Sequence, residues 1–339
     1  MPRRSTLLGA TAATAALLVI GYSVGSVIVY ERLTSIGPCP EAWDANDPTR
    51  FAAIGPDGAP LGGAAFDTTP YRMPAPQEVR IRSRDPGIEL AGWFIAAAEA
   101  DAPVVIVVHG RAACRRDPTA LLPAGMLHRR GFGVLMIDLR EHGESTIEDG
   151  HYAAGTEEYR DILGAWDWLQ HEKLVAADRI GLAGVSLGAA TVLIAAGREP
   201  AVAAVWADSS YANLPEFIRD ELGRQGLPTF FDIGAVVAGR ILHGDDIAAI
   251  SPLDSVRSLS GRPLFITHGE ADAVIDVRHG HELAAAAAAG GPAAQTWFVA
   301  GSGHTLAMID RPTEYEDRLV TFFRAALRPD VARDAARAR

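Results

Sequence analysis

Residues Arg179–Ala195 read RIGLAGVSLGAATVLIA, and this stretch decides the fold. An apolar run of strand character ends at Val185, one hydroxyl follows at Ser186, and an alanine-rich helical run begins directly after it. The pattern Gly-x-Ser-x-Gly at Gly184–Gly188 suits a strand that turns into a helix within one residue, because side chains at the glycine positions would collide there. The pattern predicts that Ser186 stands exposed at a sharp turn. The alternative is that these small residues only let a strand pack closely on a helix.

On both sides of this stretch, the chain alternates strand-like and helix-like segments. Runs that are apolar on both faces are typical of buried parallel strands, and helical patterns such as residues 155–172 lie between them. The first two runs are separated by a turn and predict an antiparallel hairpin. The expected strands lie within residues 78–83, 88–97, 103–110, 133–140, 179–186, 201–209, 263–269 and 294–301. This alternation predicts an α/β protein with a sheet between two helical layers.

One segment interrupts the alternation between the sixth and seventh expected strands. Residues 211–250 show helical periodicity and include Phe217, Leu227, Phe230 and Phe231. A segment of this length between two neighbouring strands is typical of an inserted cap over a site.

A serine hydroxyl is a weak nucleophile unless a histidine accepts its proton and a carboxylate orients that histidine. Asp272 follows the expected strand at 263–269, and His304 follows the last one. The carboxyl ends of parallel strands meet at one edge of the sheet, so both side chains are expected beside Ser186. Asp208 and Asp276 are competing candidates for the acid. The sequence predicts a Ser186, His304 and Asp272 triad.

Two backbone N–H groups are needed to stabilise the oxyanion that forms when such a serine attacks a carbonyl. Leu187 follows the serine at the start of a helix and is expected to supply one. The second is expected from Arg111, in the loop after the first parallel strand, where His109 and Gly110 let the backbone approach.

The N-terminus carries a signal for membrane insertion. Residues 7–30 contain no charged side chain and are long enough as a helix to cross a bilayer. Arg3 and Arg4 precede this run, which predicts that the N-terminus stays inside and that the catalytic domain is extracytoplasmic, on a single-pass cell-membrane anchor. A cleaved signal peptide is the alternative, although the run is long for one and no small-x-small site follows it.

The two cysteines, Cys39 and Cys114, are expected to lie in an oxidising compartment. They can form one disulfide between the segment after the anchor and the loop after the first parallel strand. They can equally remain two separate thiols, and the sequence leaves both possibilities open.

Charge and motifs exclude several classes of function. With 31 Lys and Arg against 42 Asp and Glu the net charge is −11, and no basic cluster is present, so nucleic acid is not an expected partner. Lys173 is the only lysine and lies outside any phosphate-binding motif. His279 and His281 lack further ligands at metal spacing. No cofactor and no metal are expected.

Taken together, the pieces VVHG, DLREHGES, GVSLGAA, SPLD, THGEADAVID and GSGH resemble the alpha/beta-hydrolase superfamily, over roughly residues 76–327. Within it, they look most like membrane-tethered bacterial serine hydrolases of esterase, lipase or acyl-peptidase type. The resemblance implies an eight-stranded, mostly parallel sheet and the roles given above for the triad and for Arg111 and Leu187. One departure is Glu141, where the family pattern has glycine; that stretch is structural in the family.

These observations predict a serine hydrolase that cleaves a carboxylic ester, small or lipid-like, through an acyl-enzyme. A serine peptidase or acyl-aminopeptidase acting on short peptides is the alternative, and a catalytically silent membrane-anchored binding module is the alternative from another class. The oligomeric state stays open. The expected organisation is a cytoplasmic N-terminus at residues 1–6, an anchor at 7–30, a connecting segment at 31–75, the hydrolase domain at 76–329 and a tail at 330–339.

Overall fold

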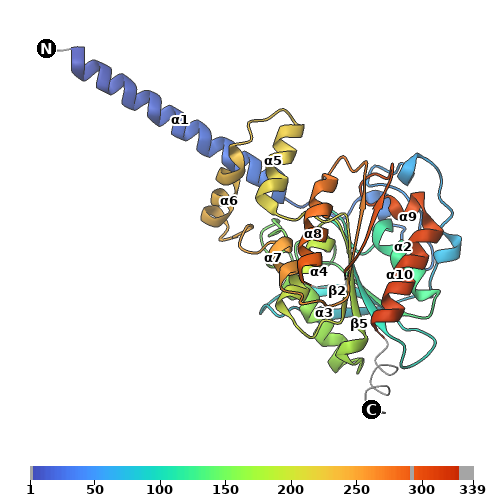
Figure 1. The fold of residues 1–339 in the computed structure, drawn as a ribbon. Helices are drawn as coiled ribbons and strands as arrows, with labels where there is room; N and C mark the ends of the chain where they lie inside the picture. The colour runs from blue at the N-terminus through green and yellow to red at the C-terminus, as the bar shows by residue number, and fades with distance from the viewer. Residues whose placement is uncertain (1–2, 291–293, 328–339) are drawn as a thin grey trace.

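The computed structural model describes residues 3–290 and 294–327, and an eight-stranded sheet forms its centre (Figure 1). The strands are β1 Gln77–Arg82, β2 Glu89–Ile95, β3 Val104–Val108, β4 Gly133–Ile137, β5 Ile180–Val185, β6 Ala204–Asp208, β7 Leu264–Gly269 and β8 Ala294–Val299. Seven of the eight lie within the runs predicted for them, and β1 begins at Gln77, one residue before its predicted run. The strand order is β1-β2-β4-β3-β5-β6-β7-β8.

The sheet is mostly parallel, as predicted. β1 and β2 form an antiparallel hairpin in which Val79 lies opposite Gly92, and β2 is also antiparallel to β4. From β4 to β8 neighbouring strands are parallel. The chain order reverses around β3, so the loops after β3 and β5 open on the same edge, where α/β sheets usually place ligands.

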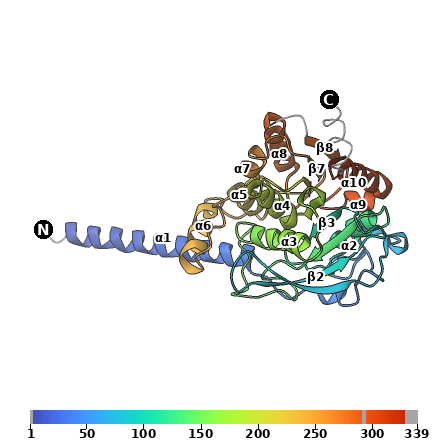
Figure 2. The same cartoon turned by 90° about the horizontal axis from the view of Figure 1, so that it is seen from below.

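Helices cover both faces of this sheet, which is why β3 to β7 are buried along their whole length. Figures 1 and 2 show α2, α9 and α10 on one face and α3, α4, α7 and α8 on the other. The helices are α1 Arg3–Thr34, α2 Pro118–His128, α3 Tyr159–His171, α4 Leu187–Arg198, α5 Leu214–Arg224, α6 Phe231–Leu242, α7 Pro252–Arg257, α8 Val277–Gly290, α9 Ala307–Asp310 and α10 Pro312–Ala326.

The N-terminal helix α1 projects away from the body in both views (Figures 1 and 2). Its segment Thr11–Thr34 is long and apolar enough, by length and composition, to cross a membrane. Residues 11–24 are exposed, whereas Ser26, Val29 and Tyr30 are buried against the protein. The helix therefore continues four residues beyond the predicted boundary at residue 30, because its last turns pack on the cap.

The cap consists of α5 and α6, inserted between β6 and β7 within the predicted segment. Helix α6 lies along α1 at very close range. A Cβ on Gly234 would collide with Ser26, and a Cβ on Gly239 would collide with the ring of Tyr30. Small residues at such crossings let two helix backbones approach each other.

The segment after α1 folds onto the body through short helical turns, and it buries Trp43, Phe51 and Tyr71. Cys39 and Cys114 form a disulfide, which selects one of the two possibilities that the sequence left open. The bond ties this segment to the loop after β3. The predicted tail at residues 330–339 lies outside the described residues.

Candidate active site

Ser186 stands at the turn between β5 and α4 with φ +53° and ψ −119°, a conformation that residues with side chains rarely adopt. Two glycines make this turn possible. A Cβ on Gly184 would collide with the backbone of Gly188, and a Cβ on Gly188 would collide with the carbonyl of Val108. The Ser186 N–H donates to the carbonyl of Asp208 at 2.8 Å, which fixes the turn against β6. Strain held in this way by the surrounding backbone is typical of functional positions.

The three residues predicted as a triad lie in one hydrogen-bonded row. His304 Nε2 lies 2.9 Å from Ser186 Oγ, and His304 Nδ1 lies 2.7 Å from Asp272 Oδ2. An ionised carboxylate only accepts hydrogen bonds, so Nδ1 carries the ring proton and Nε2 can accept the proton of the serine. The geometry is that of a nucleophile, a base and an orienting acid.

Further donors converge on Asp272. Its Oδ1 accepts the N–H groups of Val274 and Ile275 at 2.8 and 2.9 Å, and its Oδ2 lies 3.2 Å from His268 Nε2. Burial alone would raise the pKa of Asp272, but the hydrogen bonds from His268, His304 and Ile275 hold it well below its ordinary value. Asp272 is therefore ionised at neutral pH and can stabilise an imidazolium at His304.

The two competing candidates for the acid, Asp208 and Asp276, form hydrogen bonds with residues other than His304. Asp208 accepts hydrogen bonds from Tyr315 Oη and Ser209 Oγ, both at 2.9 Å, and burial raises its pKa to about 6. Asp276 accepts the N–H of Arg278 at 2.9 Å. The acid that meets His304 is Asp272.

The predicted oxyanion donors border the same space as the serine. Leu187 is the first residue of α4, so its N–H is among those that have no acceptor within the helix. Gly110 lies against Ser186, since a Cβ placed on it would be 3.3 Å from the Ser186 Cβ, and Arg111 follows directly. Arg111, Ser186 and Leu187 all line one pocket.

This pocket has a volume of about 420 Å³ and a largely apolar wall made by three parts of the chain. The body supplies Ser186 with its neighbours, as well as Tyr152 and Tyr211. The cap contributes Phe217, Ile218, Leu222, Leu227 and Phe231, and the N-terminal helix α1 contributes Gly25, Ile28, Val29, Arg32 and Leu33. The space over the serine is thus closed by the cap and by the end of α1 together.

Sequence reasoning missed two features of this site. His268 lies in β7 and points to Asp272, and the only signal for it was its place at the carboxyl end of a strand. The α1 residues that line the pocket gave no signal, because the apolar pattern of residues 7–30 already predicts a membrane span.

The sheet order, the turn at Ser186 and the inserted cap define an alpha/beta hydrolase, as the sequence predicted. A family model described as the prolyl oligopeptidase family matches residues 123–330, which is more than half of the chain. The chain belongs to this family of hydrolases.

Individual proteins agree with this assignment. The uncharacterized protein YfhR of Escherichia coli K12 is 26% identical over 259 residues, covering 75% of this chain and 82% of the relative. Human protein ABHD12B is 26% identical over 210 residues, covering 56% of this chain and 51% of the relative.

Solved structures show the same fold. The esterase Pf2001 of Pyrococcus furiosus superposes with a TM-score of 0.60 at 23% identity, over 78% of this chain and 97% of the esterase. The acylaminoacyl peptidase of Pyrococcus horikoshii gives a TM-score of 0.55 at 19% identity, over 75% of this chain and 42% of the peptidase. The two neighbours cleave different bonds, so the fold leaves the substrate class to be argued from the site.

Proposed function

We propose that this protein is a membrane-anchored serine hydrolase that cleaves carboxylic esters of apolar acyl groups. The observation that supports this most strongly is the row from Ser186 through His304 to Asp272, which opens into an apolar pocket roofed by the cap and the anchor helix. The three residues of the row would cleave the ester bond, and the apolar pocket would favour apolar acyl groups.

In the proposed reaction, Ser186 Oγ attacks the ester carbonyl carbon while His304 Nε2 takes the hydroxyl proton. The carbonyl oxygen becomes an oxyanion, which the N–H groups of Leu187 and Arg111 stabilise. The intermediate then collapses, the bond to the alcohol oxygen breaks, and His304 returns the proton to the leaving alcohol. Asp272 remains ionised and keeps the imidazole oriented throughout.

Water then releases the acyl group. The oxygen of a water molecule attacks the carbonyl carbon of the acyl-enzyme, and His304 accepts a proton from that water. Collapse of the second intermediate breaks the bond to Ser186 Oγ, which regains the proton from His304. The products are a carboxylic acid and free enzyme, and no cofactor enters the reaction.

The exposed face of the cap supports a substrate that comes from the membrane. Phe230, at the N-cap of α6, and Ile233, Val237 and Ile241 within it form an apolar stripe whose side chains are between 46% and 74% exposed. This stripe adjoins α1, whose exposed part is equally apolar. Helices with such a face lie in the lipid interface. We propose that α6 rests in the bilayer beside the anchor and that lipid-like esters enter there.

The proposed topology places the N-terminus inside and the hydrolase domain outside the cell membrane. Arginines before the apolar segment support this orientation. The Cys39–Cys114 disulfide also supports it, because such bonds persist in oxidising compartments.

A peptidase is the second candidate, and the family match favours it. A peptidase that binds a free amino terminus needs unpaired carboxylates near the serine. Of the described residues that line the pocket, Glu221 is the one carboxylate, and it is paired with Arg224. This pairing argues against a peptidase that binds a free amino terminus.

A panel of p-nitrophenyl esters of increasing acyl length, measured beside aminoacyl p-nitroanilides on detergent-solubilised full-length protein, tests the proposal. We expect kcat/KM to rise from acetate toward medium-chain esters, with the anilides slower than every ester. Faster hydrolysis of the anilides would make the protein a peptidase. Absence of turnover on the whole panel would support a silent binding module.

A further inference from the structure

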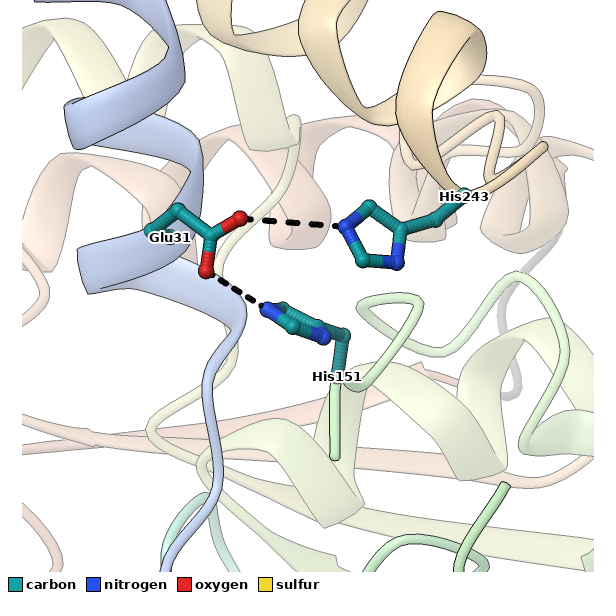
Figure 3. Close-up of side chains that lie close together, drawn as sticks. All are labelled: Glu31, His151 and His243. Atoms are coloured by element: carbon teal, nitrogen blue, oxygen red, sulfur yellow. Dashed lines mark hydrogen bonds and ion pairs between the residues drawn. The ribbon is translucent and has the colours of Figure 1, made fainter. Parts of the chain in front are cut away.

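A second cluster of histidines and carboxylates lies where the anchor helix, the body and the cap meet (Figure 3). Glu31 comes from α1, His151 from the loop that precedes α3, and His243 from the end of α6. The Glu31 carboxylate points between the two rings. Its Oε2 lies 2.9 Å from His151 Nε2, and its Oε1 lies 3.7 Å from His243 Nε2.

The other nitrogen of each ring is held by a single residue, Asp149. His243 Nδ1 lies 2.7 Å from Asp149 Oδ2, and His151 Nδ1 lies 3.2 Å from the Asp149 carbonyl oxygen. Both oxygens can only accept, so both Nδ1 atoms carry a proton. Nε2 is therefore the atom through which each ring faces Glu31, where it can either donate a second proton to the carboxylate or bind a cation.

Because the Glu31 carboxylate can only accept, its place beside two Nε2 atoms requires positive charge between them. Within the described chain, Glu31 has no Arg or Lys ion-pair partner; its partners are His151, His243 and Ser35. Two ring protons or one metal ion would supply this charge. The arrangement in which a carboxylate or carbonyl orients a metal-binding histidine through Nδ1 is common around zinc.

The dimensions of the cluster suit zinc. Tetrahedral zinc with ligands at about 2.0–2.1 Å separates neighbouring ligand atoms by about 3.3 Å. One Glu31 oxygen lies 2.9 Å from His151 Nε2 and the other lies 3.7 Å from His243 Nε2, and one ligand atom from each of the three residues can be chosen so that all three lie within 4.8 Å of one another. Two histidines and one carboxylate leave a fourth position for water, which is a known zinc ligand set.

A second group with similar composition lacks these properties. In the group of Glu216, His279 and Glu282, the His279 Nδ1 accepts the N–H of Ala212 at 3.3 Å. Its Nε2 therefore carries the proton and donates it to a carboxylate instead of offering a lone pair. Arg278 also pairs with both glutamates of that group. The orientation of the rings singles out the cluster at the anchor.

The surroundings of the anchor cluster fit a cation. His151 and His243 border a cavity of about 430 Å³ that contains more carboxylates than arginines. Its acidic residues are Asp85, Glu141, Glu148, Asp149, Glu157 and Asp245, and its arginines are Arg140 and Arg160. Glu141 also accepts the N–H groups of Glu148 and Gly150, both at 2.7 Å, so it fixes the loop that carries Asp149 and His151.

We propose that Glu31, His151 and His243 bind one zinc ion that fastens the cap to the anchor helix and the body. The ion joins α1, the loop before α3 and the end of α6, the parts whose packing closes the pocket over Ser186. This site does not depend on the hydrolase proposal, because zinc binding is measured without a substrate.

The test uses full-length protein without a histidine tag, solubilised in detergent, stripped with a chelator and returned to ZnCl₂. We expect one zinc per chain after gel filtration, a higher melting temperature and slower amide hydrogen exchange in α6. The His151→Ala/His243→Ala variant is expected to bind zinc at least about 100-fold more weakly, and Asp149→Ala about 10–100-fold more weakly. His171→Ala, which removes an exposed histidine on α3, is the matched control and should bind as the wild type does.

Failure of wild-type protein to retain zinc would overturn the proposal, and so would undiminished binding by the double variant. If the double variant does not fold, the site can still be tested on the wild-type protein by replacing zinc with cobalt and recording the absorption spectrum. Absorption bands of tetrahedral cobalt with nitrogen ligands would support the site, whereas an octahedral, water-like spectrum would contradict it.

Discussion

The molecule holds two histidine–carboxylate clusters that differ in where their carboxylates lie. At the sheet edge, Asp272 lies behind His304, and the free ring nitrogen faces the hydroxyl of Ser186. At the anchor, Asp149 lies behind both rings, and a second carboxylate, Glu31, lies in front of them. In the first arrangement His304 can take the proton of Ser186 while Asp272 stays ionised and orients the ring. The second leaves a place that positive charge must fill.

The clusters also differ in what holds them. The catalytic row stands on the carboxyl ends of β5, β7 and β8, which belong to one buried sheet. The anchor cluster spans three segments that meet through helix packing. Changes in the sheet edge should therefore affect the chemical step, and changes between α1 and α6 should affect the pocket and the cap.

The largest expected effect comes from breaking the catalytic row. Asp272→Asn is expected to lower kcat about 10⁴-fold, because the amide no longer favours the ring tautomer that accepts the serine proton. Steady-state ester hydrolysis measures this loss. Asp208→Asn, at the end of the neighbouring strand, is the matched control; it should destabilise the fold by about 1–3 kcal/mol and leave kcat within about tenfold. Equal losses of kcat in both variants would contradict the assignment of the acid.

Loss of the disulfide should loosen the segment that follows α1 and leave the geometry of Ser186, His304 and Asp272 unchanged. Cys39→Ser is expected to lower the free energy of unfolding by about 2–4 kcal/mol, since the bond closes a loop with a sequence separation of 75 residues. Denaturant titration in detergent measures the loss. A variant as stable as the wild type would show that the bond does not constrain the chain.

A methyl group added between α1 and α6 should alter the pocket and leave the catalytic row unchanged. Gly234→Ala places a Cβ against Ser26 and is expected to lower kcat/KM about tenfold for long-chain esters while acetate esters are hydrolysed as before. Gly223→Ala in α5 is the matched control, because its Cβ would meet its nearest neighbour at an ordinary 3.8 Å. Equal losses of kcat/KM for short and long esters would show that the substitution affects the chemical step and not the binding of the acyl chain.

The smallest effect is expected from removing the charge in front of the anchor histidines. In Glu31→Gln the charge is lost but the side-chain amide can still hydrogen-bond to the rings, so the metal-free variant should stay within about 1 kcal/mol of the wild type. Zinc should then raise its melting temperature less than that of the wild type. Thermal denaturation with and without ZnCl₂ decides between this outcome and an unchanged zinc response.

The sheet and the catalytic row could be predicted because their signals are local. Buried parallel strands read as short apolar runs, and Gly184–Gly188 fits one kind of turn. Asp272 and His304 each follow a strand, so strand order alone placed them at the edge that carries Ser186. Glu141 could be noticed as a departure, but its role in holding the loop before α3 required the structure.

The anchor cluster could not be predicted because its residues are far apart in the sequence. Glu31, His151 and His243 have no common spacing, and they meet only because Gly234 and Gly239 let α6 approach α1. The apolar pattern of residues 7–30 predicts a membrane span and hides the fact that the end of the same helix lines the pocket. Contacts between distant helices depend on packing, which single-sequence patterns do not encode.

The central claim is that Ser186 is a nucleophile activated by His304. Labelling of the full-length protein with a fluorophosphonate probe, followed by mass spectrometry of the modified peptide, tests it most directly. We expect one label per chain on Ser186 and no label in Ser186→Ala, while Ser258→Ala, which removes an exposed serine, labels as the wild type does. An unlabelled wild type, or undiminished labelling of Ser186→Ala, would contradict the account.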